Sequence, residues 1–148
     1  IQHETTPMAT FAQPNPLLLD PPVSKAALWT GRVLSGLVIL FLLFDGAIKL
    51  VPLQVVTDTS LQLGIPTHLA RTLGVLTLAC VALYAHPRTA VLGAILLTGY
   101  IGGAIYVHVR ADSPLFTHTL FGVYLALMAW GGLWLRDPRL RALIPLRD

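Results

Sequence analysis

The chain has 148 residues, of which 55% are hydrophobic and only 11% are Asp, Glu, Lys or Arg, whereas an ordinary soluble domain carries roughly 25% charged residues. This composition, with a mean hydropathy of +0.71, excludes a soluble enzyme and predicts an integral membrane protein. The net charge of +3 comes from sparse basic residues, which argues against a nucleic-acid partner, and the single Cys80 excludes an internal disulfide and a zinc site built on several thiolates.

Residues 1–27 are rich in proline, and we expect them to form an extended tail. They lack the basic start, short apolar run and cleavage site of a secretory signal. The first methionine is Met8, and the sequence leaves open whether the true N-terminus lies there or upstream. Because extended proline-rich chain binds protein surfaces at low entropic cost, we expect the segment Pro14–Pro22 to contact a partner protein.

Residues 28–148 contain four long apolar segments, each close to the roughly 17–25 residues that a spanning helix needs. Backbone amides in lipid must be satisfied within the segment, so these segments are expected to be helices. We therefore predict an all-α, four-helix membrane bundle forming one domain. Its helices lie at about 28–51, 69–85, 89–109 and 115–135.

Two of the connections are short. Pro87 and Arg88 link the second and third helices, and Ser113-Pro114 supplies an N-cap and a first-turn proline to the fourth. Such links predict antiparallel neighbours in the bundle.

Two further short helices are expected at the membrane surface. The connection at residues 52–67 has apolar residues at helical spacing and ends at Gly64 and Pro66, which predicts a short interfacial helix. After the fourth span, residues 139–143 form a basic amphipathic segment, whose leucines we expect to face the lipid while its arginines contact headgroups.

The distribution of basic residues predicts the orientation of the bundle. With four spans both termini share one side, and seven basic residues lie on that side against three on the other. This imbalance places both termini in the cytoplasm and the protein in a bacterial inner membrane. An interfacial aromatic belt is expected at the cytoplasmic helix ends, formed by Trp29, Tyr84, Trp130 and Trp134.

Asp45 and Lys49 stand four residues apart on the first helix, so they share one face and can form an ion pair. Ionisable residues at membrane depth are costly and normally face a bundle interior or a wet cavity. Two interpretations stay open. Either Lys49 extends to the outer interface with Asp45 as its structural partner, or Asp45 faces a cavity as a proton acceptor or as a hydrogen-bond partner of a ligand.

His108 ends the third helix and His118 begins the fourth, so antiparallel packing is expected to bring both into the outer layer with Asp45 and Lys49. Arg71 and Arg110 are expected to complete a ring of polar groups there. Because the spacing matches no metal-binding motif, we predict no metal site. The polar layer is either structural or a site that hydrogen-bonds a quinone carbonyl or another small polar head.

Small residues interrupt the third and fourth helices at Gly99, Gly102, Gly103 and Gly122, which predicts close helix packing. Tyr100 lies between Gly99 and Gly102, and Tyr106 follows this patch. An aromatic pocket for a ring-shaped ligand is the alternative interpretation of this patch.

Several runs resemble the DoxX-like family over about Leu28 to Arg147: Phe44-Asp45-Gly46 with Lys49, residues 87–100, Gly102-Gly103-Ala104, His108-Val109-Arg110 and residues 135–141. The resemblance implies a four-helix inner-membrane protein associated with redox partners, in a family named for a small subunit of a thiosulfate:quinone oxidoreductase. The bundle is also similar in outline to vitamin K epoxide reductase. That enzyme depends on paired cysteines, so Cys80 alone cannot support its chemistry, and we expect no catalytic activity from this chain on its own.

Three functional hypotheses follow. The leading one is an accessory or anchoring subunit of a larger respiratory or photosynthetic electron-transfer complex, contacted partly by the N-terminal tail. The alternatives are a quinone-binding component of a membrane oxidoreductase and a small-molecule carrier or membrane chaperone. No intrinsic cofactor is expected, and the candidate ligands are a quinone and a bound lipid.

Overall fold

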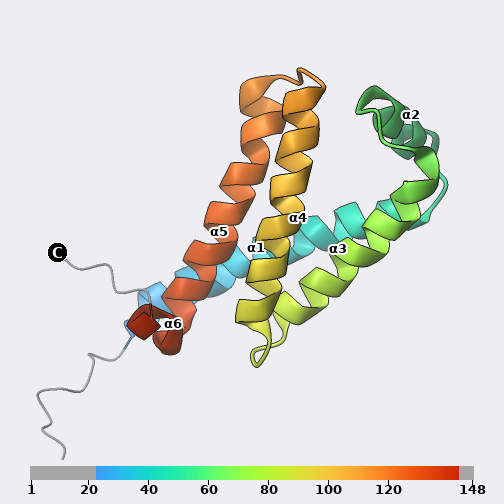
Figure 1. Cartoon of the computed structure of the whole chain (residues 1–148). Helices are drawn as coiled ribbons and strands as arrows, with labels where there is room; N and C mark the ends of the chain where they lie inside the picture. The colour runs from blue at the N-terminus through green and yellow to red at the C-terminus, as the bar shows by residue number, and fades with distance from the viewer. Residues whose placement is uncertain (1–22, 144–148) are drawn as a thin grey trace, which may run out of the picture.

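The structure is a computed structural model that describes residues 23–143. The long helices are α1 (Lys25–Leu50), α3 (Ala70–Ala85), α4 (Ala90–Arg110) and α5 (Leu120–Arg136), and α2 (Gln54–Gln62) and α6 (Pro138–Leu143) are short (Figure 1). A 3₁₀ turn, η2 (Thr67–Leu69), precedes α3, and a π-helical turn, η3 (Leu115–Thr119), precedes α5. Of the tail expected at residues 1–27, residues 1–22 lie outside this range, as do the last five residues of the chain, and residues 25–27 already belong to α1.

Within residues 23–143, four helices are long and apolar enough to cross a membrane, counting η2 with α3 and η3 with α5. The fold class predicted from the sequence is therefore confirmed, including the short helix between the first two spans. Ser24 begins α1 by accepting a hydrogen bond from the Ala27 amide, as an N-cap residue does.

The four spans form a closed ring of neighbours in the order α1, α3, α4, α5. The turn between α3 and α4, the start of α1 and α6 lie towards one end of the bundle, and α2 and the turn between α4 and α5 lie towards the other (Figure 1). From the turn that joins them, α3 and α4 diverge towards the α2 end.

Each of the four helix interfaces contains glycine at a point of close approach. A Cβ atom added at these positions would come closer than 3.0 Å to an atom of the neighbouring helix, so a larger residue would force the backbone or a side chain of that helix to shift. The glycines are Gly31 and Gly132 between α1 and α5, Gly46 and Gly74 between α1 and α3, Gly93 between α3 and α4, and Gly122 between α4 and α5.

The expected packing role of Gly99, Gly102 and Gly103 is wrong for contacts within the described chain. A Cβ at any of the three would meet no atom within 4 Å. The face of α4 that enters the core is instead the one that carries Leu97 and Ile101, both of which are buried. The glycines lie outside this face, so they leave the side of α4 slim without bringing a neighbour close.

The core is centred between the mid-bundle and the α6 end, around the fully buried Tyr84. Its hydroxyl lies 3.0 Å from the Ser35 hydroxyl and donates a 2.7 Å hydrogen bond to the Ala129 carbonyl. The guanidinium of Arg136 lies 5.5 Å from the ring centroid. The expected place of Tyr84 in an interfacial aromatic belt is therefore wrong, because its hydroxyl finds partners inside the bundle.

The C-terminal helix α6 also differs from the expectation. Leu140 is 3% exposed and belongs to the core, and Arg141 donates hydrogen bonds to the carbonyls of Trp134 at 2.9 Å and Leu135 at 2.7 Å. These bonds satisfy carbonyls at the end of α5 that have no partner within the helix. Leu140 and Arg141 thus pack α6 on the bundle, whereas the sequence predicted that they contact lipid and headgroups.

Candidate functional site

A cavity of about 530 Å³ lies in the half of the bundle towards α2. Apolar side chains form most of its wall, among them Phe41, Ile101 and Leu125. Its polar side chains come from four elements: Asp45 and Lys49 on α1, Thr59 on α2, Tyr100 and His108 on α4, and His118 on η3. An apolar cavity with a few converging polar groups is the usual form of a small-molecule site.

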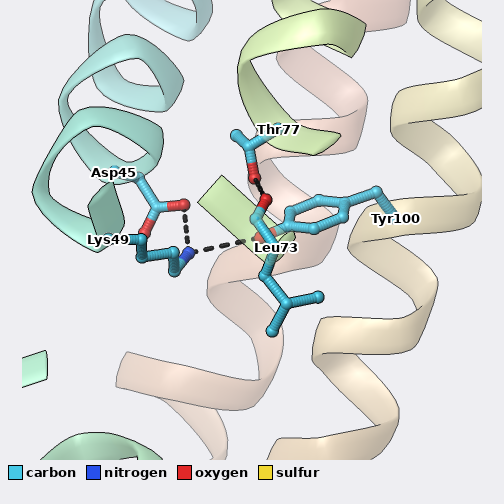
Figure 2. Close-up of polar contacts among 5 residues, drawn as sticks. All are labelled: Asp45, Lys49, Leu73, Thr77 and Tyr100. Atoms are coloured by element: carbon cyan, nitrogen blue, oxygen red, sulfur yellow. Dashed lines mark hydrogen bonds and ion pairs between the residues drawn. The ribbon is translucent and has the colours of Figure 1, made fainter. Parts of the chain in front are cut away.

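Asp45, Lys49 and Tyr100 form a polar cluster at this cavity (Figure 2). Lys49 makes an ion pair with Asp45 one turn earlier on α1, and its Nζ donates a 3.2 Å hydrogen bond to the Tyr100 hydroxyl. The side chains of Lys49 and Asp45 are 24% and 29% exposed, so both are mostly withdrawn from the surface. The side chain of Lys49 thus points into the bundle towards α4. A lysine that extended to the membrane interface would point out of the bundle instead.

The structure also brings His108 and His118 together, with ring centroids 5.8 Å apart. His108 Nδ1 lies 3.1 Å from the Ser113 hydroxyl, and His118 Nδ1 lies 2.8 Å from the Thr117 hydroxyl. Each ring therefore has one nitrogen occupied by a neighbouring hydroxyl. The π-helical turn that carries His118 is an element frequently found at functional sites.

The three remaining candidates do not join the cavity. Arg110 donates to the carbonyls of Leu63 at 3.2 Å and Gly64 at 3.4 Å, which fastens the segment after α2 to the end of α4. Arg71 lines a separate cavity of about 350 Å³. Tyr106 is 66% exposed on the outer side of α4. None of the three lines the larger cavity, although Lys49 also lines the cavity of Arg71. The ring of polar groups predicted for Arg71 and Arg110 stays a prediction.

Several contributors to the site were not anticipated. Thr59, Leu63 and Ile65 line the cavity from α2 and the segment after it, and Ser113 partners His108. No periodicity in the sequence distinguishes Thr59, because it faces a cavity built mainly by other helices. The prediction that Ser113 caps the fourth helix is wrong, because Pro114 is the residue that precedes the first turn. The hydroxyl of Ser113 forms a hydrogen bond with His108 instead.

No three His, Cys, Asp or Glu side chains within residues 23–143 are placed to hold a metal ion together. The two cavity histidines with Asp45 on another helix do not form such a group. The polar groups of the cavity are arranged to donate and accept hydrogen bonds.

Four apolar spans around a cavity with a polar cluster define a multi-pass membrane protein with a candidate small-molecule site. The chain belongs to the DoxX-like family, whose family model matches residues 33–132. This match is shorter than the resemblance seen in the sequence, since residues 135–141 lie beyond it, but it includes every residue that lines the larger cavity. No curated protein and no solved structure matches the chain.

Proposed function

We propose that this DoxX-like protein is the quinone-binding component of a membrane oxidoreductase. The observation that carries the proposal is the cluster of Asp45, Lys49 and Tyr100 at the wall of a mainly apolar cavity. A quinone combines an apolar body with carbonyl oxygens that need hydrogen-bond donors.

The charges of the cluster favour a neutral ligand. Asp45 and Lys49 compensate each other, so an anionic head would bring an uncompensated charge into a largely apolar site. Lys49 and Tyr100 have protons to donate to a quinone carbonyl, and Asp45 has oxygen atoms to accept a proton from the corresponding quinol hydroxyl. One cluster can thus bind both states of the ligand.

Reduction of a quinone to a quinol consumes two electrons and two protons. In this proposal the cavity residues bind the ring and exchange protons with it, and a partner protein of the oxidoreductase supplies the electrons. His108 and His118 line the same cavity towards the α2 end of α4 and extend the set of proton-exchanging groups.

The proposal is tested by titrating decylubiquinone into the protein reconstituted in lipid nanodiscs. Tyr100→Phe removes only the hydroxyl that contacts Lys49, and we expect it to weaken binding about tenfold. Tyr106→Phe, on the same helix but outside the cavity, is the matched control and should bind like the wild type. Absence of saturable binding to the wild type, or an equal effect of the two variants, would contradict the proposal.

A second candidate is the role of an accessory or anchoring subunit of a larger electron-transfer complex. The observation that favours it is the slim side of α4 at Gly99 and Gly102, where no helix of the described chain approaches and a partner helix would have room. The expected tail contact at Pro14–Pro22 lies outside the described residues.

Purification in gentle detergent followed by mass spectrometry tests this candidate. A stoichiometric partner that is lost when residues 1–23 are deleted would support the predicted tail contact. A protein that purifies without any partner chain would contradict the accessory role.

A further inference from the structure

We propose that the ligand of the larger cavity carries a long hydrocarbon tail, which leaves between α3 and α4 across Gly103 into the lipid. This inference rests on the proposed function and specifies its ligand class: a lipid-resident quinone that enters sideways from the membrane, as opposed to a short ring compound that enters from water. The tail would leave where the wall of the cavity is open.

The cavity is long compared with a single ring. Its lining on α4 extends from Gly99 to His108, which corresponds to about 13 Å at 1.5 Å per residue. The polar cluster contacts only part of this length, at Tyr100. The remaining wall is mainly apolar, so a ring bound at Lys49 leaves apolar space for the first part of a tail.

Two sides of the cavity are covered by side chains. On the side of α1 and α5, the rings of Phe41 and Phe121 are in edge contact with centroids 4.9 Å apart. At the α2 end, Leu63 and Ile65 line the cavity, and Arg110 holds the backbone of this segment.

The side between α3 and α4 is different. Gly103 and Ala104 line the cavity and are exposed, and Leu73 is the residue of α3 that lines it. A Cβ at Gly103 would meet no atom within 4 Å. From the turn that joins them, α3 and α4 diverge (Figure 1), and the hydroxyl of Tyr100 points to Lys49 (Figure 2).

Because α3 and α4 are long and apolar enough to cross a membrane, we expect this opening to face lipid. A hydrocarbon tail in the opening would stay in the apolar phase throughout, whereas its complete burial within the protein would require a longer cavity. Gly103, which packs no helix within the described chain, thereby gains a function: it keeps the wall of α4 thin where the tail passes.

The test compares Gly103→Leu with Gly102→Leu in nanodiscs, using decylubiquinone and the same ring without its tail. Gly102 has the same free space but does not line the cavity, so it is the matched control. Leucine forms helices better than glycine, so both variants should fold. We expect Gly103→Leu to weaken decylubiquinone about tenfold and to change binding of the tail-less ring by less than about twofold. Gly102→Leu should leave both affinities unchanged.

The outcomes distinguish a failure of the tail path from a failure of the proposed quinone site. If Gly103→Leu binds decylubiquinone like the wild type, or weakens both ligands equally, the opening is not the tail path, and the proposed quinone site still stands. If the wild type binds neither ligand, the quinone proposal fails and the tail path fails with it. Selective loss of the tailed ligand supports both.

Discussion

The hydroxyl of Tyr100 on α4 lies 3.2 Å from Nζ of Lys49 on α1 and accepts its hydrogen bond. A residue of the third span thus contacts the ion pair that Lys49 forms with Asp45 within the first span. This contact connects two helices that lie opposite each other in the ring of four. It explains why the Asp45–Lys49 pair is directed to the cavity, since the second partner of Lys49, Tyr100, lies on a helix across the bundle.

Asp45→Asn should lower the free energy of unfolding, because it leaves the Lys49 ammonium without its charged partner in a mostly withdrawn position. We expect a loss of about 1–2 kcal/mol after allowing for the remaining solvent exposure. Denaturation in detergent measures the change. Asp58→Asn on the exposed side of α2 is the matched control and should cost less than about 0.5 kcal/mol. Adding Lys49→Met to Asp45→Asn should recover stability, and failure to recover would show that the unpaired charge is not the cause.

Tyr84→Phe should destabilise the bundle although it removes one oxygen only. The change removes the 2.7 Å hydrogen bond that the buried Ala129 carbonyl accepts from Tyr84. It also removes the hydroxyl with which Ser35 forms a hydrogen bond. A loss of about 1–3 kcal/mol is expected from unsatisfied buried groups. Tyr124→Phe, at a position that is 45% exposed, provides the comparison in the same thermal unfolding assay. Equal melting temperatures for the two variants would argue against the importance of this buried network.

Two glycines of α4 should respond to alanine in opposite directions. Gly93→Ala places a methyl group against the backbone of Tyr84 and Leu83, so the free energy of unfolding should fall by about 1–3 kcal/mol. Gly102→Ala meets open space and should raise it by about 0.5–1 kcal/mol through better helix propensity. Both changes are read from unfolding in the same detergent. A loss of stability at Gly102 would mean that this face is packed in the purified protein.

The orientation in the membrane stays a prediction from basic residues, and single-cysteine labelling tests it. In a Cys80→Ser background, Asp58→Cys on α2 should react with a membrane-impermeant maleimide in intact cells after the outer membrane is permeabilised. Arg88→Cys, in the turn between α3 and α4, should react only after the inner membrane is also opened. The reverse pattern would place both termini outside the cytoplasm.

The sequence alone determined the number of spans, the short helix between the first two, the pairing of Asp45 with Lys49 and the proximity of the two histidines. These features follow from local physics: the length of apolar runs, helical spacing and short antiparallel connections. The same information predicted the DoxX-like family, which the family model confirms over residues 33–132.

Only the tertiary structure decided which glycines touch a neighbour and which leave α4 open, because a glycine's environment depends on the rotation of each helix about its axis. It likewise placed Tyr84 in the core, Arg110 on the segment after α2 and Tyr106 on the exposed surface. In a chain whose outer surface is as apolar as its core, hydrophobic periodicity does not distinguish the two sides of a helix. The contacts across helices therefore had to come from the packed bundle.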